Sequence, residues 1–202
     1  MLKIHYFVTC CKLIFMKKIL LTALFAISAA GVYAQGADAM KAYMEYSTPG
    51  EMHKMLGKYN GLWTATTKMW MSPGMEPSVS FADVTNDMYY GDRYQKSVFN
   101  GDMQGMPFQG ESVTGYDNIK KAFTNTWIDN YATGVMYSEG KWDAATKSVE
   151  FKGNASDPMT QTATPFRQVM TFPDENNYSM VMYVMMEGKE YKSMEITFTR
   201  KK

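Results

Sequence analysis

The sequence has little that supports nucleophilic or metal chemistry. Both of its cysteines, Cys10 and Cys11, lie near the N-terminus, and the chain after residue 34 has a single histidine, His53. Without cysteine, residues 35–202 can form neither a disulfide nor a thiolate metal site. A serine–histidine pair would have to use His53, and no Gly-x-Ser-x-Gly elbow stands between a strand and a helix. We therefore predict no catalytic residue, no metal site and no cofactor.

An excess of basic residues and a long apolar run are also absent. The formal net charge is +1, and removal of residues 1–34, which hold four lysines and no acidic residue, would make it −3. This balance gives no reason to expect nucleic acid as a partner. The apolar run from Ile19 to Ala30 is shorter than the roughly 20 residues that a spanning helix needs. We therefore expect a protein that does not span a membrane.

The N-terminal segment has the pattern of a secretory signal peptide. Two lysines follow Met16, an apolar run comes next, and small residues precede a cut after Ala34. We expect residues 1–34 to be removed, with Met16 as the true start or, alternatively, Met1. Because no cysteine follows the cut, a lipid anchor there is not expected. The predicted location is periplasmic or secreted.

The rest of the chain is long enough for one domain with its own core. Residues 35–47 predict a weak helix or a loose arm. Residues 48–202 contain no repeat, no low-complexity segment and no linker that would split them. We therefore predict one domain over 48–202.

A short helix is predicted at the start of this domain. Thr48 as a cap and Glu51 three residues later fit a capping box, and Gly57 is a typical end residue. The apolar residues between them would share one face, namely Met52, Met55 and Leu56. His53 is interpreted as a residue that helps to seat this helix on the rest of the domain.

The chain beyond residue 60 consists of β-rich runs separated by turn residues about every 8–12 positions, which is typical of an antiparallel sandwich or barrel. The last run alternates, with Met194, Ile196 and Phe198 predicted to point inward. The run from Tyr178 to Met186 is apolar at nearly every position. Such a strand is covered on both faces, and the cover would be the N-terminal helix or a second copy of the chain.

Eight short motifs follow one another along residues 48–202. They are Pro49-Gly50-x-x-His53, Gly61-x-Trp63, Pro73-Gly74, Gly91-x-Arg93, Pro107-Phe108-x-Gly110, Gly115-Tyr116-Asp117, Trp127-x-Asp129 and Met194-Glu195-Ile196-Thr197. In this order they resemble the bacterial domain-of-unknown-function 1579 family. The resemblance implies an all-β, lipocalin-like antiparallel barrel with a short N-terminal helix, and it implies no activity. Where this family tends to have Gly-Gly-Arg, the chain has Asp92 before Arg93, which leaves a special role for Arg93 open.

A barrel of roughly 8–10 strands has room for one small ligand, and aromatic and methionine linings suit an apolar or lipid-like one. We therefore predict non-enzymatic binding of such a ligand, unless the side chains simply fill the barrel. Glu111 would point into the cavity or to solvent, and Arg93 would pair with an anionic head group or end a turn. The candidate ligand-binding residues are Trp63, Arg93, Phe108, Glu111, Tyr116 and Trp127.

Three alternatives stay open. The apolar run from Tyr178 to Met186 could join copies of the chain into a homo-oligomer or serve another assembly. The methionine clusters at residues 69–75 and 180–186 could bind Cu(I) through their thioethers, although methionine also fills irregular cores. An enzyme of an unfamiliar type would have to use Glu111 or a turn aspartate.

Overall fold

The structure is a computed structural model that describes residues 36, 38–158, 160–186 and 188–202. The predicted signal peptide and its cleavage site lie outside these residues. The chain divides into two units, Met1–Thr48 and Pro49–Lys202. In the first unit, residues 38–47 form a helix. Within the described part of the chain, no helix has the length and apolar character needed to cross a membrane.

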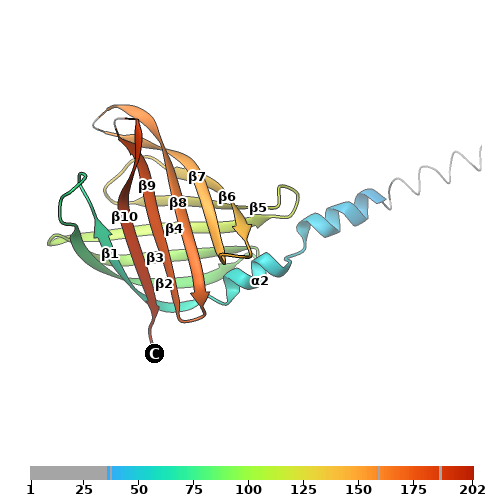
Figure 1. The fold of residues 1–202 in the computed structure, drawn as a ribbon. Coiled ribbons are helices and arrows are strands. Elements are labelled where there is room, and N and C mark those ends of the chain that lie inside the picture. The colour runs from blue at the N-terminus through green and yellow to red at the C-terminus, as the bar shows by residue number, and fades with distance from the viewer. Residues whose placement is uncertain (1–35, 37, 159, 187) are drawn as a thin grey trace, which may run out of the picture. The chain divides into compact units, whose positions relative to one another are not determined.

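The second unit is a closed barrel of ten antiparallel strands (Figure 1). Each strand pairs with the next in the chain, and β10 returns to pair with β1. The all-β barrel with a short N-terminal helix is therefore confirmed. The elements are α2 (Glu51–Gly57), β1 (Gly61–Met69), β2 (Ser78–Tyr89), β3 (Tyr94–Met103), β4 (Met106–Asp117), β5 (Ala122–Asp129), β6 (Met136–Asp143), β7 (Ser148–Asp157), β8 (Thr162–Asp174), β9 (Asn177–Met186) and β10 (Lys189–Arg200).

The core consists of alternate residues of the strands, because successive side chains of a strand point to opposite faces. In β1, Trp63 and Ala65 are buried, whereas the side chain of Leu62, which precedes Trp63, is exposed. Ala65 faces Phe198 of β10 across the pair, and both are buried. The predicted inward set of β10 is confirmed, since Ile196 and Phe198 are in the core and Met194 packs against it.

Helix α2 lies over one end of the barrel, next to β2, β3 and β4 (Figure 1). Its predicted apolar face is confirmed, because Leu56 is buried and Met52 and Met55 pack against the core. The predicted cap is wrong. The helix begins after Gly50, whose N–H donates to Nδ1 of His53 over 3.0 Å, and the hydroxyl of Thr48 instead donates to the carbonyl of Met44 over 2.6 Å.

The outer face of β9 is not where α2 docks. The helix has its main contacts with β2, β3 and β4, so the idea that it covers the apolar run in β9 is wrong. The guanidinium of Arg167 from β8 lies 4.1 Å from the ring centre of Tyr183 and covers part of that face. Met185, further along β9, is exposed.

An aromatic cluster closes the barrel end beside α2. Trp63 is fully buried, stacks on Tyr59 and meets the ring of Tyr178 edge to face. The Trp63 indole donates to the Tyr59 carbonyl over 3.0 Å, and the side-chain amide of Asn86 donates to the same carbonyl and to the Tyr178 hydroxyl. Arg200 lies over the Trp63 ring, 4.3 Å from its centre. These contacts join the segment after α2 to β1, β2, β9 and β10.

Candidate ligand cavity

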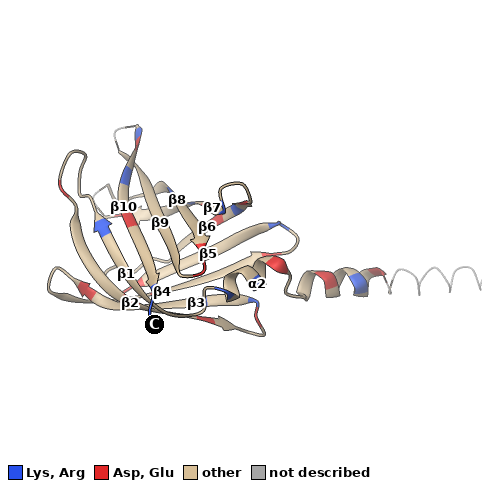
Figure 2. Cartoon of the chain, turned by 60° about the horizontal axis from the view of Figure 1, so that its bottom comes forward, with Lys and Arg blue, Asp and Glu red and all other residues tan. Residues whose placement is uncertain are grey.

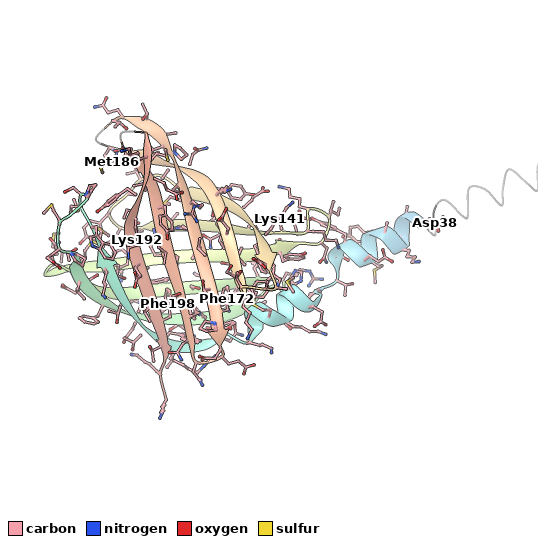
Figure 3. The ribbon with its side chains drawn as sticks, in the orientation of Figure 1. Asp38, Lys141, Phe172, Met186, Lys192 and Phe198 are labelled. Carbon is pink, nitrogen blue, oxygen red and sulfur yellow. The ribbon has the colours of Figure 1, made fainter. Side chains whose placement is uncertain are left out.

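A partly enclosed cavity occupies the barrel interior above this cluster. Its volume is about 90 Å³. Phe172 and Phe198, labelled in Figure 3, belong to its wall and lie toward the α2 end, whereas Met186 lies toward the opposite end. The lining residues come from α2, from the segment that follows it and from seven of the ten strands, so the cavity is a property of the closed barrel and not of one local motif.

The cavity wall is mostly apolar and carries no charge. One side is built from β7 to β10 by Val149, Phe151, Met170, Met180, Ile196 and Phe198. Among the described residues that line the cavity, none is Asp, Glu, His, Lys or Arg. Charged residues lie instead at many positions along the strands and loops of the barrel (Figure 2), and several form ion pairs, such as Lys96 with Glu111 and Arg167 with Glu190. A charged guest would therefore be buried without a partner, which is costly, so the wall favours an uncharged guest.

A polar cluster interrupts the apolar wall on β4 and β5. The amide nitrogen of Asn125 donates to Oγ of Ser112 over 2.7 Å and to Oγ1 of Thr114 over 2.8 Å. On β3, the amide of Gln95 donates to the Leu56 carbonyl over 2.7 Å and so fastens α2 to the barrel. The polar side chains that line the cavity are thus concentrated on β3 to β5, and Gln168 of β8 adds one more on the opposite side.

Three of the predicted ligand-binding residues lie on the inner face of the barrel. Trp127 lines the cavity. Phe108 stacks on Trp127, and Tyr116 packs edge to face against Phe123, which also lines the cavity. Gly110 is required beside Trp127, because a Cβ at this position would lie 2.5 Å from the indole ring.

The other three predicted residues lie away from the cavity. Trp63 belongs to the aromatic cluster at the barrel end. Arg93 sits in the turn between β2 and β3, where its guanidinium donates to the carbonyls of Tyr90 and Gly91. Glu111 is on the outer face of β4 and pairs with Lys96 over 2.8 Å. The barrel geometry therefore leaves the interior without a carboxylate at position 111.

The polar lining residues were not among the sequence-based candidates. Ser112 and Thr114 have the same strand parity as Phe108 and Tyr116, so alternation predicts that all four share one face. Because Glu111 has the opposite parity, placing Phe108 and Tyr116 in the interior implies that Glu111 points outward. Asn125 has the parity of Trp127 and could have been found in the same way.

The methionines of the cluster at residues 69–75 do not share one strand. β1 ends at Met69, and Met71 lies beyond the strand and is exposed. Met69 instead faces Met194, which faces Met182 of β9. In the part of the chain that the structure describes, no group of three or more His, Cys, Asp or Glu residues is placed to hold a metal.

His53 is the buried link between α2 and β4. It is 5% exposed, accepts the Gly50 N–H and hydrogen-bonds to the backbone of Tyr116. Burial lowers the pKa of His53; the bond to Tyr116 opposes this shift, and the nearby charge of Arg93 adds to it. The prediction that His53 seats the helix agrees with this geometry.

We expect acidification to weaken the barrel through His53. In the unfolded chain the imidazole takes up a proton near pH 6.5, whereas the folded state with its lowered pKa does not. The unfolded state then binds more protons, so stability falls as pH drops below about 6.5 and levels off below the folded pKa. Unfolding by urea at pH 7 and pH 5 should show this loss, and His53→Gln should reduce it. An NMR titration that gave His53 a pKa at or above 6.5 would contradict the prediction.

Comparison with known proteins identifies the family. The sequence profile described as "Protein of unknown function (DUF1579)" matches residues 48–200. The chain belongs to the DUF1579 family. The match covers the whole barrel of this DUF1579 protein together with α2.

Among solved structures, the crystal structure of Rv2717c from M. tuberculosis is similar to the DUF1579 protein. The TM-score is 0.57 at 11% sequence identity, and the match covers 77% of this chain and 100% of that chain. At this identity the similarity shows the fold alone. The comparison with curated proteins gives no match.

Proposed function

We propose that this DUF1579 protein binds one small, uncharged and largely apolar molecule inside its barrel, without chemical turnover. The cavity carries this proposal, because its wall is mostly apolar over β7 to β10 and holds no carboxylate, histidine or lysine among the described lining residues. Small-molecule sites typically combine such apolar walls with a few placed polar groups. His, Glu, Asp and Lys are the usual general acids and bases, and none of the described lining residues is one of them.

The size of the cavity limits the guest. A cavity of about 150 Å³ accommodates benzene, and the free space here is about 90 Å³. Met55, Met170 and Met180 line it, and methionine side chains adapt their shape with little cost. A slender guest, or one that displaces a methionine side chain, therefore fits best.

The protein purified from its own cells should carry the guest at one copy per chain in native mass spectrometry. Ser97→Leu, which adds bulk at a lining position, should remove the bound mass. Ser179→Leu is a matched control, because Ser179 lies between the inward residues Tyr178 and Met180 of β9 and so points outward. A wild-type chain without bound mass that also fails to bind added hexane or 2-hexanone would contradict the proposal.

Association through β9 is a second proposal that the outer face of this strand favours. Val181 and Tyr183 are half-buried and Met185 is 42% exposed, although α2 docks elsewhere. Exposed apolar surface of this kind marks interaction sites when it is contiguous. The subunit count in the same native spectrum tests this, and a strictly monomeric protein would rule out a homo-oligomer.

A further inference from the structure

A wholly apolar ligand would form no hydrogen bond with the hydroxyls of Ser112 and Thr114, which line the cavity. Both side chains line the cavity from β4. Asn125 lies directly opposite Thr114 on β5, and its amide nitrogen is 2.7 Å from Oγ of Ser112 and 2.8 Å from Oγ1 of Thr114. One amide therefore holds the two hydroxyls side by side.

Counting donors and acceptors shows what this cluster offers to a ligand. An amide nitrogen has two N–H donors, and a hydroxyl has one O–H donor and two lone pairs. The amide of Asn125 uses its donors on one lone pair of Ser112 and one of Thr114. Among the described residues, neither hydroxyl donates a hydrogen bond to a protein atom in return. Because buried polar groups are normally hydrogen-bonded, the cluster presents two O–H donors to whatever occupies the cavity.

The surroundings of the cluster exclude a charged head group. The opposite wall is formed mainly by apolar side chains of β7 to β10, including Phe151, Met170 and Ile196, and its amide group, that of Gln168, is neutral. No described lining residue is a cation, so a carboxylate beside Ser112 would lose its hydration without gaining an ion pair, which is costly. A neutral oxygen acceptor loses far less on burial and can be satisfied by the two hydroxyls.

We infer that the ligand is a neutral molecule with a slender apolar body and one carbonyl or hydroxyl oxygen, and that this oxygen accepts hydrogen bonds from Ser112 and Thr114. The inference rests on the proposed function and specifies its ligand class. The apolar body lies against the wall of β7 to β10, and the oxygen lies at β4. Fatty acids in their ionised form are outside this class.

The test uses three probes of similar length on the full chain, namely hexane, 2-hexanone and hexanoate, with binding followed by NMR shifts of the β4 and β5 amides. Ser112→Ala and Thr114→Val should each weaken 2-hexanone binding about 3- to 10-fold, the range for a lost neutral hydrogen bond. Hexane binding should stay within about twofold, because hexane makes no hydrogen bond. Hexanoate should bind at least about 100-fold more weakly than 2-hexanone, because its charge is buried unpaired.

Two further variants separate loss of the hydroxyl from loss of the fold. Thr114→Ser keeps the hydroxyl and should keep 2-hexanone affinity within about twofold. Thr126→Val makes the same change as Thr114→Val at a β5 position whose neighbours Asn125 and Trp127 point inward, so it lies on the outer face. It should leave all three affinities unchanged.

The outcomes distinguish the inference from the proposed function. If hexane binds but the loss of either hydroxyl leaves 2-hexanone unaffected, or if hexanoate binds as tightly as 2-hexanone, the inference is overturned and apolar binding stands. If neither hexane nor 2-hexanone binds the wild-type protein, apolar binding itself fails. Ser112→Ala and Thr114→Val are measured independently. If one of these variants does not fold, the 2-hexanone affinity of the other still tests the inference.

Discussion

Replacing Trp63 with alanine should lower the free energy of unfolding by about 3–5 kcal/mol, the range for removal of a buried tryptophan. Trp63 is fully buried and contacts the rings of Tyr59 and Tyr178. Its indole N–H is 3.0 Å from the Tyr59 carbonyl, and the Arg200 guanidinium lies over its face. The substitution leaves a cavity, a carbonyl with one donor fewer and an arginine without its aromatic support.

The effect should be measured by urea unfolding, with Trp70→Ala as the matched control. Trp70 is half-buried beyond the end of β1, where the Lys192 ammonium lies 4.2 Å from its ring centre. A cation–π contact at such a site contributes about 0.5–1 kcal/mol, so Trp70→Ala should cost far less than Trp63→Ala. Equal losses in the two variants would show that the aromatic cluster does not hold the barrel end closed.

The sequence predicts that Trp63 points into the barrel, but it does not predict which residues Trp63 contacts. Strand alternation indicates that Trp63 points inward, and the closed end of a barrel is one of the places for such a residue. Tyr59 lies only four residues before it, but its other partners, Tyr178 and Arg200, lie more than a hundred residues further along the chain. No periodicity in the sequence specifies which of these distant residues meet.

The strands were predictable because each has a simple cause. β10 alternates apolar and polar residues, and the sequence places Met194, Ile196 and Phe198 inward as the structure does. The helix end was less predictable, because Thr48 and Glu51 fit a local capping pattern. In the barrel, His53 fulfils that role at Gly50, since burial against β4 fixes its imidazole there.

The polar side of the cavity depends on strand register, which a single sequence does not give. Asn125 reaches Ser112 and Thr114 only because β5 pairs with β4 so that Asn125 lies opposite Thr114. A shift of one residue would point Asn125 outward and remove the cluster from the interior. The separation of a polar and an apolar side inside the barrel therefore arises from the order and register of ten strands, and only the parity of each residue was available beforehand.

Phe151→Ala should also cost about 3–5 kcal/mol of unfolding free energy, and in this case a ligand should restore part of the loss. Phe151 is 1% exposed, lines the cavity and packs against Phe123. Its removal extends an existing cavity within an apolar wall, and a void of this kind can stay open and admit benzene. At a benzene concentration ten times its dissociation constant, the variant should regain about 1.4 kcal/mol.

The measurement is urea unfolding of wild type and variant with and without benzene, with Phe81→Ala as the control. Phe81 is 62% exposed on the outer face of β2, so its truncation should change stability by no more than about 0.5 kcal/mol and should create no response to benzene. If Phe151→Ala lost stability but gained no benzene response, the wall would have collapsed into the space of the missing ring. That result would mean that the interior closes around its side chains, and it would count against a persistent ligand cavity in the wild-type protein as well.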